Sequence, residues 1–269
     1  MKKILLILSL SVIFLFTACK KEEKIQLSSS EKKSITENGE EDTLKLGFDQ
    51  AFPPMGFKDD GGEFVGFDID LAKEVTKKLN MKLELIPISW DAKDAELESG
   101  NINCIWNGFT MTGRENNYTF SDPYMKNSQV IVVKDNSKIS KLDDLKGLTL
   151  EVQSDSTGEN TLNSEEKKDF KNSLGNVISV SDYMTALSDL ESGGCDAVLI
   201  DEVLVRYNIQ NGKKIKVLDD NLSDEEYAIG FKKGNNELRD KIQKGLDELK
   251  ENGKIEEISK KWFGKDISE

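Results

Sequence analysis

The chain has 269 residues, a formal net charge of −13 and a sequence pI near 4.8. This length is enough for one large domain or for two smaller lobes with a sizeable core. An acidic surface does not attract a phosphate backbone, which disfavours nucleic acid as a partner. The absence of histidine excludes Ser-His-Asp triads, Cys-His nucleophiles and histidine-bound zinc.

Residues 1–18 are typical of a secretory signal peptide. Two lysines follow Met1, and the apolar stretch over 4–16 is too short to span a membrane comfortably. The stretch ends in L-F-T-A-C, which resembles the lipobox of bacterial lipoproteins, with Phe16 where leucine is usual. The resemblance implies cleavage before Cys19 and a lipid such as palmitate on that cysteine. The alternative is an ordinary signal peptide followed by an incidental cysteine.

Residues 19–42 are rich in Lys, Glu and Ser and contain few apolar side chains. Such a segment cannot bury enough apolar surface to fold, so we expect a flexible tether. A lipid, a tether and a globular body predict a protein held at the outer face of the bacterial cell membrane, on the extracellular or periplasmic side. The folded part should begin near Thr43.

Strand and helix patterns alternate from Leu44 onward. The pattern predicts a strand over 44–49, a helix over 67–79, a strand over 83–88, a helix over 91–100 and a buried strand over 102–108. Strands and helices in this order predict an α/β protein with mainly parallel sheet.

One short sequence, L-E-S-G, occurs at 97–100 and again at 190–193. Each copy ends a helical pattern and precedes an apolar strand, and these strands end at Gly108 and Asp201. Ligands of open parallel sheets bind outside the carboxyl ends of the strands, so two such ends could face each other across a cleft. Chance recurrence is the alternative, because all four residue types are common.

Two short apolar strands, 129–133 and 225–231, are candidate hinge crossings between two lobes. Between residues 236 and 264 we expect two amphipathic helices that pack on the core. The predicted limits are 43–126 with 228–269 for lobe 1 and 127–227 for lobe 2.

The cysteines show no metal-binding spacing. Cys104 and Cys195 lie in apolar runs, so we expect reduced core residues rather than a disulfide. We expect neither a metal nor a cofactor.

Between Leu44 and Gly264 the chain carries, in this order, the motifs G-F-D-Q-A-F-P-P-M-G-F, V-G-F-D-I-D-L-A, W-N-G-F-T-M-T-G-R, F-S-D-P-Y, L-D-D-L-K-G, D-A-V-L-I-D and K-K-W-F-G. This series resembles the extracellular amino-acid-binding proteins of ABC importers, in particular those for glutamine and for lysine or arginine. The resemblance implies a two-lobed, periplasmic-binding-protein-like α/β fold with two crossing hinge strands. It also implies a monomer that captures a free polar or cationic amino acid and delivers it to an ABC permease complex.

A bound amino acid needs partners for its carboxylate and its ammonium, because both charges lose water when a cleft closes. Arg114 is the natural carboxylate clamp because it follows a strand end and a turn, whereas Arg206 and Arg239 lie on helical segments. The resemblance implies that Gly108 offers its carbonyl to the ammonium and that Thr110 offers its amide and hydroxyl to the carboxylate. In the family the arginine usually stands seven residues after this glycine, and here it stands six after it.

Across the cleft, Ser156 and Thr157 open a helical pattern whose free amides would complete the carboxylate pocket. A plain helix cap is compatible with this role, because the same groups can serve both. Gln153 should line the site, and Asp155 stands where the family commonly has glycine.

Asp201 ends the apolar run A-V-L-I, and we expect its carboxylate to hold the ligand ammonium. The resemblance places Asp49 at a position that often reads the ligand's side chain, and an aspartate there favours donors such as Gln, Lys or Arg. It also implies that Phe52 and Trp90 are two aromatic walls. Asn107 should lie beside the pocket.

We expect a binding protein rather than an enzyme, because the sequence shows no distinctive catalytic dyad. The alternatives are a lyase on the same fold, with carboxylates or lysines doing acid-base work, and a sensor that acts through a separate receptor.

Overall fold

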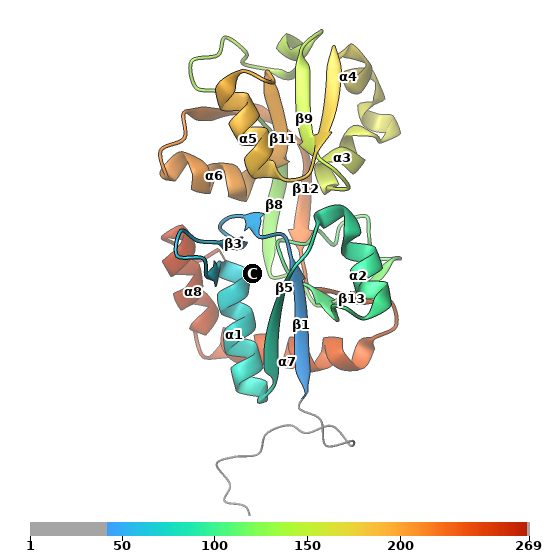
Figure 1. The fold of residues 1–269 in the computed structure, drawn as a ribbon, viewed down its shortest axis with the longest axis vertical. Helices are drawn as coiled ribbons and strands as arrows, with labels where there is room; N and C mark the ends of the chain where they lie inside the picture. The colour runs from blue at the N-terminus through green and yellow to red at the C-terminus, as the bar shows by residue number, and fades with distance from the viewer. Residues whose placement is uncertain (1–41, 268–269) are drawn as a thin grey trace, which may run out of the picture. The chain divides into compact units, whose positions relative to one another are not determined.

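The computed structural model describes residues 42–267, which form two lobes, each built on a five-stranded sheet with helices on its faces (Figure 1). The predicted signal peptide, the lipidation of Cys19 and the tether up to residue 41 lie outside the described residues. The start of the first strand at Thr43 agrees with the predicted start of the folded part.

The sheet of lobe 1 has the strand order β5-β1-β6-β13-β7. Its strands are β1 (Thr43–Phe48), β5 (Lys82–Pro87), β6 (Cys104–Ile105), β7 (Tyr118–Phe120) and β13 (Gly230–Lys232). Its helices are α1 (Phe67–Leu79), α2 (Lys93–Ser99), α7 (Asn236–Glu251) and α8 (Lys254–Phe263), with a 3-10 turn over Trp90–Ala92. A small antiparallel sheet of β2 (Ala51–Phe52), β3 (Gly56–Lys58) and β4 (Phe64–Val65) sits before α1.

The sheet of lobe 2 has the order β10-β9-β11-β8-β12. Its strands are β8 (Met125–Lys134), β9 (Thr149–Gln153), β10 (Asn176–Val180), β11 (Ala197–Asp201) and β12 (Ile215–Tyr227). Its helices are α3 (Thr157–Leu162), α4 (Lys168–Ser173), α5 (Tyr183–Ser192) and α6 (Glu202–Gln210), with 3-10 turns over Leu142–Leu145 and Glu165–Lys167.

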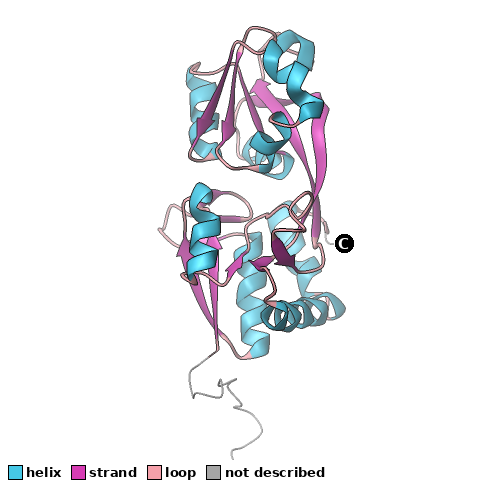
Figure 2. Cartoon of the chain, turned by 90° about the vertical axis from the view of Figure 1, so that its right-hand side faces the viewer, coloured by secondary structure: helices cyan, strands magenta, loops and turns pink. Residues whose placement is uncertain are grey.

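Strands β8 and β12 carry the chain between the lobes, as Figure 2 shows from the side. They pair antiparallel from Met125 opposite Tyr227 to Lys134 opposite Ile215, with register irregularities around Asn221. The predicted hinge run 129–133 lies on β8, whereas the run 225–231 includes only the last three residues of β12 and continues into β13. The limits of the lobes themselves stay a prediction.

The sheets are mixed rather than mainly parallel. β1 pairs parallel with β5 and β6, and β9 pairs parallel with β10 and β11, as the alternating pattern predicts. β13 is antiparallel to β6 and β7, and β8 is antiparallel to β11 and β12. The antiparallel strands are those next to the two chain crossings, where the chain returns without a crossover helix.

Helix α1 illustrates how the predicted pattern folds. Its apolar residues lie buried at helical spacing, its first turn is acidic and its last turn basic, which suits the helix dipole. The helix ends at Asn80, which adopts the left-handed conformation with φ of 51°. Cys104 and Cys195 are free and buried, which confirms the prediction for both.

Candidate functional site

A small cavity lies between the lobes, and its walls come from both. Four of the walls begin where a strand ends: after β1 and β6 in lobe 1, and after β9 and β11 in lobe 2. Its lining residues are Phe52, Trp90, Asn107, Gly108, Thr110, Gln153, Ser156, Thr157, Tyr183 and Asp201. The structure thus brings together nine of the eleven residues predicted to bind the ligand. The other two, Asp49 and Arg114, contact the lining residues.

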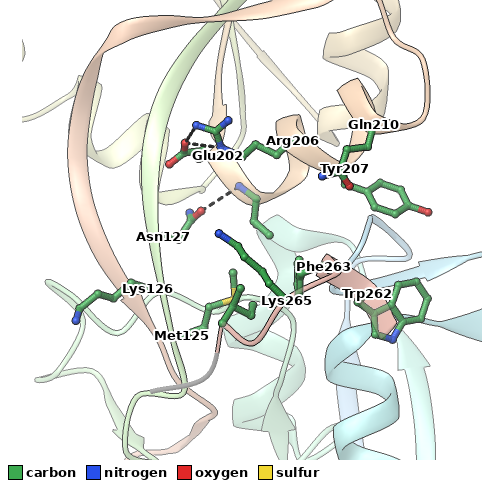
Figure 3. A pocket seen from close by; sticks show the side chains of 12 residues that line it. Met125, Lys126, Asn127, Glu202, Arg206, Tyr207, Gln210, Trp262, Phe263 and Lys265 are labelled. Carbon is green, nitrogen blue, oxygen red and sulfur yellow. Dashed lines mark hydrogen bonds and ion pairs between the residues drawn. The ribbon is translucent and has the colours of Figure 1, made fainter. Parts of the chain in front are cut away.

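A larger and more open hollow lies between α6 and the C-terminal segment (Figure 3). Its cations Lys126, Arg206 and Lys265 are exposed, and the Arg206 guanidinium turns to Glu202 on the same helix. Charges that stay hydrated make weak partners for a small ligand. The smaller cavity, with buried polar groups from both lobes, is therefore the candidate site.

Gly108 follows β6 and adopts a left-handed backbone with φ of 57°. A Cβ atom here would lie 2.9 Å from the Tyr227 ring and 3.0 Å from the Phe52 ring, so only glycine fits. The amide of Gly108 donates to the Asp68 carboxylate at 2.6 Å, and the Tyr124 hydroxyl donates to the same oxygen at 2.9 Å. Asp68 is fully buried, and burial raises the pKa of its carboxyl to about 7.

Arg114 lies next to the cavity rather than in its wall. Its guanidinium donates to the carbonyl of Thr110 at 3.2 Å and to the hydroxyl of Thr157 at 2.9 Å, and it lies 5.1 Å from the centroid of the Phe109 ring. The short loop after Gly108 therefore still brings the arginine to two lining residues, one in each lobe.

The segment after β9 forms the opposite wall. Ser156 is the N-cap of α3, and its hydroxyl accepts from the Glu159 amide at 3.1 Å. Asp155, immediately before it, has φ of 56°, so an aspartate here adopts the backbone that glycine would favour. The plain cap is therefore present, and Ser156 and Thr157 also line the cavity.

Asp201 ends β11 and lies in a buried polar cluster. Its Oδ1 accepts from the side-chain amide of Asn127 at 2.8 Å, from the side-chain amide of Gln129 at 2.9 Å and from the Tyr227 hydroxyl at 2.5 Å. Both amides also donate to the buried Glu225 carboxylate. Burial and the charge of Glu225 raise the pKa of Asp201 well above its usual range. A cation entering the cavity would stabilise the charged form of Asp201.

Asp49 follows β1 and contacts two residues of the cavity wall, Asn107 and Gln153. Its carboxylate accepts from the Ala51 amide at 2.8 Å and from the Gln153 side chain of the other lobe at 2.8 Å. Burial raises the pKa of Asp49 to about 6, although these two hydrogen bonds oppose the shift. Asn107 accepts from the Asp49 amide, and its own buried side-chain NH₂ has no partner among residues 42–267.

The aromatic residues lie on both sides of the cavity. Phe52 and Trp90 come from lobe 1 and are buried. Tyr183, from α5 of lobe 2, lies 5.9 Å from Phe52 between ring centroids. Rings at this spacing pack against each other as an aromatic pair, and an exposed aromatic face attracts a cationic group.

The sequence model of one protein family, the bacterial extracellular solute-binding proteins, family 3, matches residues 44–265 of this chain. The chain belongs to this family. The cystine-binding protein TcyA of Bacillus subtilis is 31% identical over 229 residues, 84% of this chain and 82% of TcyA.

Two solved structures are similar to this solute-binding protein along most of its length. One is a substrate-binding protein of a Streptococcus pneumoniae ABC uptake transporter with bound histidine, with a TM-score of 0.81 and 38% identity over 84% of this chain and 94% of that chain. The other is an ancestral arginine-binding protein bound to glutamine, with a TM-score of 0.75 and 40% identity. The match covers 83% of this chain and 98% of that chain. The predicted two-lobed binding-protein fold is confirmed.

The sequence did not single out three residues that shape the site of this solute-binding protein. Asp68 holds Gly108, Glu225 shares donors with Asp201, and Tyr183 lines the cavity. A signal existed only for Asp68, which lies in the quoted motif V-G-F-D-I-D-L-A.

The family is extracellular, which agrees with the predicted side of the membrane. Within residues 42–267 no helix is long and apolar enough to cross a bilayer.

Proposed function

We propose that this protein captures one free amino acid between its lobes and delivers it to an ABC permease. The cavity supports this most directly: an arginine reaches its rim from lobe 1, and a buried aspartate lines it from lobe 2. An amino acid carries one charge of each sign, and each buried charge needs a partner of opposite sign.

The carboxylate end of the ligand is assigned to Arg114, Thr110, Ser156 and Thr157. Arg114 already donates to the hydroxyl of Thr157, and a carboxylate at this place could take over guanidinium N–H groups in a charge-assisted pair. The ammonium end is assigned to Asp201 and the carbonyl of Gly108.

The side-chain end is assigned to Asp49, Asn107 and Gln153, between the walls formed by Phe52 and Trp90. Gln153 donates to Asp49 across the cleft, the type of bond that a ligand amide or ammonium would make. The buried NH₂ of Asn107 offers one further donor. These groups favour a polar or cationic side chain that both donates and accepts, and they disfavour aliphatic ligands, which could not replace the hydrogen bond from Gln153 to Asp49.

We further propose that the protein is a monomer anchored by a lipid on Cys19, and that it is not an enzyme. A lipid and a tether would keep the lobes near a permease in the same membrane. Incubating the protein with each amino acid and searching for a new product by mass spectrometry tests the lyase alternative. Turnover with any of them would contradict the proposal.

A thermal-shift screen of the common amino acids with ornithine and cystine tests the function. A ligand at 100 times its Kd should stabilise the protein by about 2.7 kcal/mol. For a domain of this size that raises Tm by roughly 5 to 10 °C. We expect the largest shifts among Gln, Arg, Lys, His and ornithine. If no amino acid moves Tm, the proposed function is wrong.

A further inference from the structure

One ion pair, between a buried lysine and a partly exposed aspartate, crosses the cleft outside the ligand cavity. Lys93 begins α2 in lobe 1, and its side chain is 2% exposed. Its ammonium pairs with the Asp155 carboxylate of lobe 2, and it donates to the Asp155 carbonyl at 3.2 Å and the Trp90 carbonyl at 3.4 Å. Figure 1 shows α2 at the top of the lower lobe, on the same flank as α3 at the bottom of the upper lobe.

Asp155 occupies a backbone position that would suit glycine better. Its φ is 56°, and Asn80 is the only other non-glycine residue within 42–267 with positive φ. A β-carbon is unfavourable in this conformation. The turn is held by the Asp155 amide, which donates to the Glu159 carboxylate at 2.7 Å. The Asp155 carboxylate itself pairs with Lys93. The interaction that an aspartate adds at this position, compared with a glycine, is therefore a contact with the other lobe.

Three lobe 1 side chains contact the short segment 153–157 of lobe 2. Asp49 accepts from Gln153, and Arg114 donates to Thr157. Under the proposed function a ligand competes for both of these contacts. Lys93 and Asp155 do not line the cavity, so their pair can persist when a ligand is bound.

We propose that Lys93 and Asp155 form a cross-lobe latch that favours the closed form and determines how long a ligand is retained. The role in retention rests on the proposed function; the effect on closure does not. The pair exists only when the lobes are closed, so it shifts the equilibrium by its full interaction free energy. Lys93 also lies 5.3 Å from the centroid of the Trp90 ring, which couples the latch to a wall of the cavity.

The closing equilibrium is measured first, on the full chain without ligand. Single-molecule FRET between dyes on α7 and α4 reports the ratio of open to closed molecules. We expect Asp155→Gly and Lys93→Met each to raise this ratio about tenfold, which corresponds to about 1.4 kcal/mol. The double variant should show little further change, because either substitution alone removes the pair.

Asn80→Gly is the matched control. It relieves the same left-handed backbone, with φ of 51°, at the end of α1. We expect it to leave the ratio unchanged. Asp155→Gly should keep the wild-type fold, because glycine adopts this backbone without strain, so any opening is not the result of misfolding. A wholly open wild type, an unchanged ratio in Asp155→Gly or additive single effects would overturn the latch.

Retention is measured by stopped-flow release of L-arginine, and of L-glutamine in parallel, followed by tryptophan fluorescence. We expect both latch variants to release the bound amino acid about tenfold faster, with Asn80→Gly like the wild type. Unchanged release together with a more open ligand-free form would remove the role in retention. If neither amino acid binds the wild type, the assignment of the ligand fails, and the FRET ratio still decides the effect on closure.

Discussion

Asp68→Asn should change how stability depends on pH. Asp68 is fully buried, and burial raises the pKa of its carboxyl from 3.8 to about 7. Between these values the folded protein binds a proton that the unfolded chain has released. The free energy of unfolding therefore falls as pH rises from about 4 to about 7, and the loss persists above pH 7.

The magnitude follows from the two pKa values. The full effect is about 4 kcal/mol at 1.36 kcal/mol per pH unit, and about 2 to 3 kcal/mol of it falls between pH 5 and pH 8. Asparagine has no such titration but keeps an oxygen that can accept from the Gly108 amide and the Tyr124 hydroxyl. The difference in the free energy of unfolding, variant minus wild type, should thus increase by about 2 to 3 kcal/mol from pH 5 to pH 8. Any pH-independent cost of the substitution cancels in this comparison.

Urea denaturation of both proteins at pH 5 and pH 8, followed by circular dichroism, measures the difference. Asp144→Asn is the control, because the Ser140 amide lowers the pKa of this exposed carboxyl. That carboxyl is charged at both pH values in the folded and the unfolded chain, so its variant should follow the wild type. An Asp68→Asn variant with the same pH dependence as wild type would refute a protonated Asp68.

Three further predictions concern ligand binding, measured by isothermal titration calorimetry with amino acids identified in the screen. Arg114→Ala should lower the affinity for every amino acid at least tenfold, because the ligand carboxylate loses its guanidinium partner. Unchanged affinity would remove Arg114 from the site. Asp49→Asn should change the order of preference among side chains, and a uniform loss would assign Asp49 to the ammonium instead. Gly108→Ala should destabilise the fold by about 2 to 4 kcal/mol and abolish binding, since its Cβ would meet Tyr227 and Phe52; wild-type Tm would contradict this.

The sequence predicts the parts of the site that depend on local patterns. Apolar runs that end in Asn107-Gly108 and at Asp201 give the strand ends, and the parallel arrangement brings such ends to one edge. The repeat L-E-S-G lies in both copies at the end of a helix before a strand, at α2 and α5.

Long-range partnerships are not visible in the sequence. Asp68 and Gly108 are 40 residues apart, and Thr110 donates to Glu225 across 115 residues. Lys93 looks like a solvated residue of an acidic helix, and only the folded contacts with Asp155 of the other lobe and with Trp90 explain its burial. The mixed sheets were missed for the same reason: the strand pattern gives no direction of pairing.

The position of β13 determines which part of the molecule can be completed first during synthesis. β13 comes from residues 230–232, yet it lies between β6 and β7 in its sheet. The five strands of lobe 2 all come from one continuous stretch, 125–227. As the polypeptide emerges from its amino terminus, the later-encoded sheet can close while the earlier one still lacks an inner strand. Translocation that delays the last forty residues would therefore leave β6 and β7 without the strand that joins them.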